Sequence, residues 1–90
     1  MKFERRPWGW FLTLYSSPTM WIKLIRVGWT QRTSVQSHRE RDEIHISLRG
    51  IVRVPRDEKH CLYNGTYLEI ATGAPREEDI DRFDDKYGRV

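Results

Sequence analysis

The chain has 90 residues, of which 38% are hydrophobic and 32% charged, and its formal net charge is +3. This composition predicts one small soluble domain over residues 1–90, with a thin core, because so short a chain buries only roughly 60–65% of its unfolded surface. No run approaches the ~20 apolar residues of a membrane helix. The mild basic excess suits an anionic ligand but is too small to indicate nucleic acid.

The cysteine count and the N-terminal residues bear on the cellular compartment. Cys61 is the only cysteine, so no intrachain disulfide can form, which fits a reducing cytosol. Basic residues precede a short apolar stretch at residues 8–14, but Gly9 and Thr13 interrupt it and no small-residue cleavage site follows. We therefore expect a cytoplasmic protein without a signal peptide.

Most of the sequence has the composition and alternation of β-strands. Strands are predicted over residues 10–15, 20–27, 33–38, 43–48, 51–54, 60–63 and 66–71. Asn64-Gly65 is typical of a tight hairpin turn. The charged residues 75–87, with Ile80 and Phe83 three apart, predict a short amphipathic helix whose two apolar side chains pack on the sheet. Short strands with frequent turns indicate a β-sandwich or barrel.

Four polar side chains have the chemistry of metal ligands. Gln36 and His38 point to the same face of an extended strand, and Glu43 opens the next strand on its polar face, beside His45 and Ser47. His60 opens a later strand. Imidazole, carboxylate and one amide oxygen suit Zn²⁺, Mn²⁺, Fe²⁺, Co²⁺ or Ni²⁺, although the amide is unusual.

The spacing of these residues resembles the two motifs of the cupins. The first is Gln36-x-His38-x4-Glu43-x6-Gly50, with Gln in place of the usual first His. The second is Pro55-x-Asp57-x2-His60-x3-Asn64, with Asp57 where a Gly is usual. The resemblance implies a small cupin-type, jelly-roll-like β-barrel that carries a short C-terminal helix, and it implies a divalent ion, Zn²⁺ foremost, on Gln36, His38, Glu43 and His60.

Three further segments narrow the resemblance to one family. They are Arg6-Pro7-Trp8-Gly9, residues 34–38, and the C-terminal stretch from Glu78-Asp79-Ile80 to Gly88-Arg89. They are similar to the C-terminal cupin domain of type II mannose-6-phosphate isomerases, which are commonly fused to mannose-1-phosphate guanylyltransferases. The similarity runs from about Arg6 to Arg89.

The chain departs from that family in three ways. Arg39 and Glu40 follow His38 where the family has further histidines, and Thr30 stands where the family has a turn glycine. A β-hairpin is missing between Gly50 and Pro55, so the chain is a shortened, minimal cupin domain. The nucleotidyltransferase domain is absent from this sequence.

The resemblance implies a metal-dependent isomerase that interconverts mannose 6-phosphate and fructose 6-phosphate, in activated-sugar or polysaccharide synthesis. Such a reaction needs an acid–base group near the substrate and a cation for its phosphate. Glu69 is the candidate carboxylate, and Lys23 and Arg41 are the candidate cations. Lys23 in an apolar strand also fits a snorkelling side chain, and Glu69 also fits a solvent-facing ion pair.

A second hypothesis is a cupin that binds a sugar or metabolite without turnover, which the missing hairpin and altered histidines favour. A nucleic-acid binder would rest only on the basic charge and four Trp, which are more often core or interface residues. We expect no nucleic-acid or membrane partner. The strand edges left by the missing hairpin predict a homodimer, which a monomer by light scattering at micromolar concentration would contradict.

Overall fold

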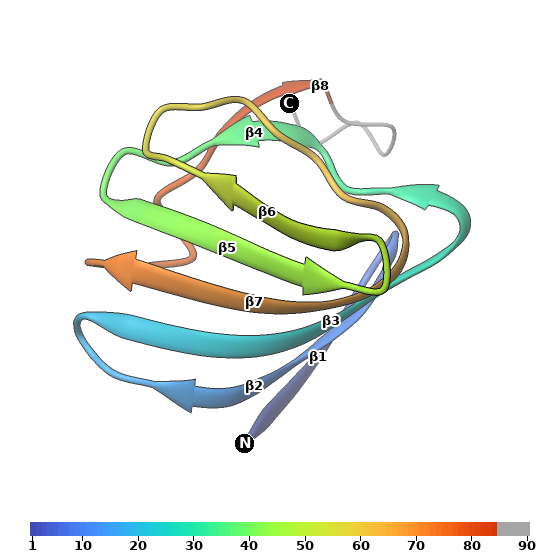
Figure 1. Ribbon diagram of the computed structural model, residues 1–90, viewed down its shortest axis with the longest axis horizontal. Coiled ribbons are helices and arrows are strands. Elements are labelled where there is room, and N and C mark those ends of the chain that lie inside the picture. The colour runs from blue at the N-terminus through green and yellow to red at the C-terminus, as the bar shows by residue number, and fades with distance from the viewer. Residues whose placement is uncertain (85–90) are drawn as a thin grey trace.

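The computed structural model describes residues 1–84, and strands account for its regular structure (Figure 1). Along the chain these are β1 (Lys2–Arg6), β2 (Gly9–Ser16), β3 (Met20–Arg32), β4 (Val35–Ser37), β5 (Arg41–Ser47), β6 (Gly50–Val54), β7 (Tyr63–Gly73) and β8 (Asp81–Asp84). None of these residues forms a helix long and apolar enough to cross a membrane.

The strands form two antiparallel sheets that enclose the interior of a small barrel. The larger sheet has six strands in the order β1-β2-β3-β7-β5-β6, and β4 pairs with β8 in the smaller one. Figure 1 shows the smaller sheet lying over the larger one, with the loop from β6 to β7 passing beside it. The predicted all-β barrel is confirmed.

The predicted C-terminal helix is wrong. Residues 74–80 form an irregular, turn-containing segment, and residues 81–84 are strand β8. Strand β8 pairs with β4, and this pairing satisfies backbone hydrogen-bonding groups of residues 81–84. Tertiary pairing of this kind overrides a weak helical pattern. Phe83 is exposed rather than packed on the sheet, whereas Ile80 is half-buried. Residues 85–87 of the predicted helix lie outside the described residues.

The arrangement of the strands also differs from the prediction in other places. Asn64-Gly65 lies inside β7 rather than in a hairpin turn, because Gly65 pairs with Val27 of the long strand β3. His60 makes an isolated pairing with Gln36 instead of opening a strand. Strand β1, which pairs with β2, was not predicted.

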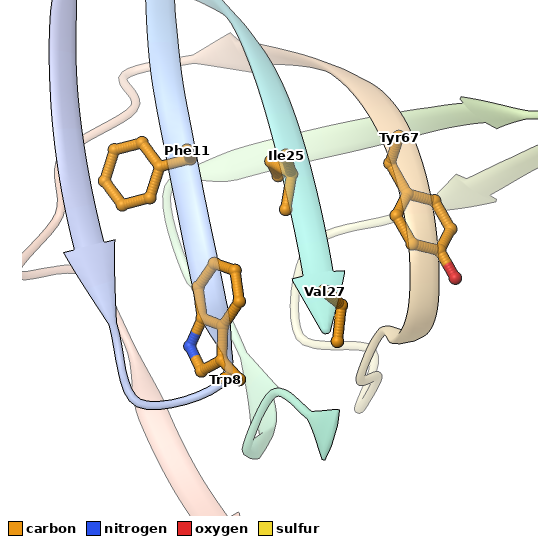
Figure 2. Packing of buried hydrophobic residues seen from close by; sticks show 5 residues of the cluster. All are labelled: Trp8, Phe11, Ile25, Val27 and Tyr67. Carbon is orange, nitrogen blue, oxygen red and sulfur yellow. The ribbon is translucent and has the colours of Figure 1, made fainter. Parts of the chain in front are cut away.

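The apolar core is a small cluster on the inner face of β2, β3 and β7. Trp8, Phe11, Ile25, Val27 and Tyr67 form it, as Figure 2 shows. The same inward face also carries the buried polar residues Lys23, Arg41, Glu43, His45 and Glu69, with Trp21 and Ala71 beside them, so the barrel has an apolar part and a largely polar part.

Among residues 1–84, Thr30 and Asp57 are the non-glycine residues with a left-handed backbone conformation, and each stands where the resemblance has a glycine. Thr30 has φ 66° at the irregularity near the end of β3, and Asp57 has φ 65° in the turn before His60. Thr30 and Asp57 therefore adopt a backbone conformation that only glycine adopts without strain.

The turn between β1 and β2 requires glycine because the backbone of β3 passes close to it. Gly9 has φ +155°, and a Cβ there would stand 1.9 Å from the Arg26 carbonyl oxygen. Trp8, buried beside it, accepts a hydrogen bond from Gly28 N–H at 2.8 Å. The Pro-Trp-Gly sequence thus fixes β2 against β3.

Substitution of Gly9 with Ala should destabilise the protein more than the same change at Gly50. Both positions have positive φ, but a Cβ at Gly50 meets nothing within 4 Å. We expect Gly50→Ala to lower the free energy of unfolding by about 1–2 kcal/mol from backbone strain, and Gly9→Ala by about 3 kcal/mol or more. Denaturant unfolding measures both, and equal losses would contradict the close approach.

Candidate metal centre

Strand β5 carries three consecutive inward-facing polar residues, Arg41, Glu43 and His45, all of them buried. Alternation of side chains along the strand places them on one face. The register sets His45 opposite Glu69 of β7, and Glu69 opposite Lys23 of β3. Three strands far apart in sequence therefore bring their polar residues into one row across the sheet.

Glu43 is the centre of this cluster, with a side chain only 1% exposed. Its Oε1 lies 3.1 Å from His60 Nε2 and 3.2 Å from His45 Nε2. Its Oε2 lies 2.8 Å from Arg41 Nε and 3.6 Å from His38 Nε2. Four nitrogens thus surround one carboxylate.

Glu43 is ionised in spite of its burial. Burial by itself would raise the pKa of Glu43, but His45, His60 and the Arg41 charge together hold this pKa well below its usual value. Neither oxygen of Glu43 has a well-aligned hydrogen-bond donor. A buried carboxylate without aligned donors is costly unless a cation compensates it, so these residues fit a divalent ion.

His38 presents a lone pair to the cluster. Its Nδ1 lies 2.6 Å from the Asp79 carbonyl oxygen, which can only accept, so Nδ1 carries the proton and Nε2 faces Glu43 and Arg41. Burial lowers the pKa of His38, Glu43 opposes this, and Arg41 reinforces it. A neutral imidazole oriented by a carbonyl is the usual state of a metal-ligating histidine.

His60 reaches the cluster from the loop between β6 and β7. Gln36 and His60 exchange two backbone hydrogen bonds of 2.8 Å each, which sets this loop beside β4. The structure therefore brings His38, Glu43 and His60 together, with ligand atoms within 4.8 Å of one another. Gln36 lines the adjacent cavity, where its Oε1 accepts a 3.4 Å hydrogen bond from Ser34 Oγ, and its role as fourth ligand stays a prediction.

Sequence reasoning missed His45. Its Nε2 lies between Glu43 Oε1 and Glu69 Oε1, at 3.2 and 3.0 Å. Burial opposes the charged form of His45, but the adjacent Glu43 carboxylate and the hydrogen bond with Glu69 raise its pKa to about 9. The signal was its place two residues after Glu43 on the same face of a strand.

Glu69 lines the cavity, as an acid–base residue would, but both of its oxygens are engaged. Oε2 accepts a 2.7 Å hydrogen bond from Trp21 Nε1, and Oε1 faces His45. The structure thus gives Glu69 buried partners rather than the solvent-facing ion pair considered above. Its catalytic role stays a prediction.

A cavity of about 210 Å³ opens beside the cluster, with Arg6, Lys23, Arg41 and Arg82 in its wall. The two cations singled out in the sequence are thus both at this cavity. Lys23 is buried, with Nζ 3.7 Å from the centre of the Trp21 ring and 2.7 Å from Glu77 Oε2. Cations that converge on a polar cavity favour an anionic ligand.

Arg41 joins the cavity to the Glu43 cluster. Its Nη2 lies 3.0 Å from His38 Nε2, and its Nη1 donates a 2.9 Å hydrogen bond to the Arg76 carbonyl. The guanidinium also lies over the Trp21 ring, 4.6 Å from its centre. This guanidinium places a positive charge against Glu43 Oε2, with Nε 2.8 Å from it.

The barrel fold and the convergence of two motif histidines on a motif glutamate define a small cupin. The chain belongs to the mannose-6-phosphate isomerase C-terminal family, whose model matches residues 2–73. The C-terminal segment that also resembles the family, residues 78–89, lies beyond this match.

One solved structure shares the fold. It is the crystal structure of a protein from Planctomyces limnophilus, with a TM-score of 0.72 and 14% sequence identity, and the alignment covers 92% of this chain and 90% of that one. At this identity the likeness shows the fold alone. No curated protein sequence matches the chain.

Asp79 fixes the segment that orients His38, so its removal should be costly. Its carboxylate accepts hydrogen bonds from the backbone N–H groups of Arg39 and Glu40, at 2.9 and 2.8 Å. We expect Asp79→Ala to lower the free energy of unfolding by about 2–4 kcal/mol, since it removes both charge-assisted bonds.

The control for this prediction is the nearby Asp81→Asn. Asp81 makes an exposed ion pair with Arg39, and such pairs contribute about 0–1 kcal/mol. Denaturant unfolding measures the free energy of unfolding of both variants. A loss at Asp79 no larger than that at Asp81 would show that the backbone contacts do not hold this segment.

Proposed function

We propose that this cupin is a metal-dependent sugar-phosphate isomerase of the mannose-6-phosphate type. The observation that carries the proposal is the ionised, buried Glu43 facing His38 and His60 beside a cavity rich in cations. An isomerase that shifts a proton beside a carbonyl needs charge stabilisation near the substrate oxygens and a cation for the phosphate. The family membership supports both requirements but does not assign the reaction to this chain.

His38, Glu43 and His60 would hold the ion, with Gln36 as the proposed fourth ligand. Two imidazoles and a carboxylate suit Zn²⁺ first, and Mn²⁺, Fe²⁺, Co²⁺ or Ni²⁺ as well. A divalent ion there would act as a Lewis acid that stabilises negative charge on substrate oxygen. Arg41 would withdraw from Glu43 toward the cavity as the ion enters, because both cations use the same oxygen.

The cavity wall would bind the phosphate. Arg6, Lys23 and Arg82 lie in it, and guanidinium groups bind phosphate oxygens bidentately. Its volume of about 210 Å³ is below the ~300–1,000 Å³ of most ligand pockets, which favours a small polar ligand. The Lys23–Glu77 pair would open to admit the anion, since Glu77 is half exposed.

A second candidate function is ligand binding without turnover. It is supported by Glu69, the buried carboxylate at the cavity, because Trp21 and His45 engage both of its oxygens. A general base needs a free oxygen within hydrogen-bond reach of the substrate proton. In this case the cupin would bind a metal and a sugar phosphate but would not interconvert isomers.

Metal content should depend on His38 and His60. We expect elemental analysis of purified protein to find at least one divalent transition metal per chain, and His38→Ala and His60→Ala each to lose one ion. Asp42→Asn is the matched control, because Asp42 neighbours Glu43 but pairs with Arg56 on the outer side. A metal-free wild type after incubation with these ions would overturn the proposal.

Turnover of mannose 6-phosphate should depend on Lys23. Lys23→Met keeps the length of the side chain and removes its charge, so we expect KM to rise roughly 10- to 100-fold, as for the loss of one charged hydrogen bond. Lys59→Met is the control, since Lys59 is exposed and does not line the cavity. Phosphate-ester binding without any turnover in the wild type would favour the second candidate.

A further inference from the structure

The described residues contain two groups of metal-ligand side chains, and Glu43 belongs to both. One is the proposed centre of His38, Glu43 and His60, and the other is Glu43, His45 and Glu69. The second group is entirely buried, with side-chain exposures of 1%, 3% and 8% for Glu43, His45 and Glu69. His45 stands at an unspecified position of the first cupin motif, and Glu69 lies outside both motifs.

We propose that Glu43, His45 and Glu69 form a second divalent-cation site, which shares the Glu43 carboxylate with the first. It rests on the proposed function only through Glu43, and it extends the single-ion centre to a two-ion centre. Its ligands are one imidazole and two carboxylates, a set suited to Mn²⁺, Fe²⁺ or Zn²⁺.

The three ligand atoms lie within 4.8 Å of one another, and the distances from His45 to each carboxylate fit one ion. Ligand atoms bound at about 2.1 Å to a tetrahedral or octahedral ion stand about 3.0–3.4 Å apart. His45 Nε2 lies 3.2 Å from Glu43 Oε1 and 3.0 Å from Glu69 Oε1. An ion at this point would replace the proton of Nε2 and lie between the two carboxylates.

The Glu43 carboxylate is the second, independent observation. It is buried, both of its oxygens lack an aligned hydrogen-bond donor, and these oxygens face different partners. Oε2 faces His38 and Arg41, whereas Oε1 lies between His60 of the first group and His45 of the second. A carboxylate in this position can bridge two ions, which in two-metal sites stand about 3.5–4 Å apart.

Trp21 fixes the far ligand. Its Nε1–H donates to Glu69 Oε2 at 2.7 Å, which leaves Oε1 directed at His45. Such a partner orients a ligating carboxylate and is typical of built metal sites. This proposed role as a metal ligand replaces the acid–base role considered for Glu69, because a carboxylate that binds an ion is not free to carry the substrate's proton.

Manganese binding tests the site. Metal-free protein is loaded with Mn²⁺, dialysed, and analysed by elemental analysis and electron paramagnetic resonance. We expect two Mn²⁺ per chain in the wild type and a spin-coupled signal from the adjacent pair. His45→Leu and the nearly isosteric Glu69→Gln should each retain one ion and lose the coupling, and Asp42→Asn should behave as the wild type. Circular dichroism confirms that each variant is folded.

His38→Ala separates the second site from the first. The second site is supported if His38→Ala retains an ion that His45→Leu and Glu69→Gln have each lost. This conclusion holds whether or not the first site is filled. One ion that is lost from His38→Ala and retained in the other two overturns the second site and leaves the proposed function intact. No bound Mn²⁺ in the wild type overturns this site, and Zn²⁺ content then tests the first centre separately. Full Mn²⁺ content with lost turnover in Glu69→Gln would identify Glu69 as an acid–base residue and overturn the site.

Discussion

The buried charge of Glu43 is the constraint on which the rest of the interior depends. An ionised carboxylate in a protein interior is expensive to desolvate unless cations or donors surround it. Here the compensation comes from the imidazoles of His45 and His60 and from the Arg41 guanidinium, supplied by strand β5 and the β6–β7 loop. The inner positions that a barrel of this size would otherwise fill with apolar side chains are therefore polar, and the apolar cluster is confined to one part of the molecule.

The small sheet and the loops serve to place the polar side chains around Glu43 rather than to enlarge the core. Gln36 pairs through its backbone with His60, so the β4 segment and the β6–β7 loop arrive together above Glu43. The Asp79 carboxylate accepts hydrogen bonds from the backbone N–H groups of Arg39 and Glu40, which follow His38. The backbone carbonyl of Asp79 fixes the His38 ring. A single residue thus couples the C-terminal segment to both the fold and the site.

The sequence supported the strands, the barrel and the positions of His38, Glu43 and His60 because these depend on local alternation and motif spacing. Even the departures at Thr30 and Asp57 are informative, since both adopt the backbone conformation of the glycine they replace. The predicted helix failed because its backbone partners come from β4, which the local pattern cannot reveal. The importance of His45 was hidden for a similar reason, because cross-strand register, and not sequence spacing, sets it against Glu69.

The polar interior also links ligand binding to stability. A thin apolar core contributes less to folding than the core of a larger domain, and a buried group of like charges opposes folding unless it is neutralised. Any cation that binds the native cluster but not the unfolded chain stabilises the fold by mass action. Arg41 performs part of that neutralisation at Glu43 Oε2, whereas His60 lies beside Oε1 and the His45 ring lies between Oε1 and Glu69. A cation bound in the native cluster would therefore share these carboxylates with Arg41 on one side and with the His45 ring on the other.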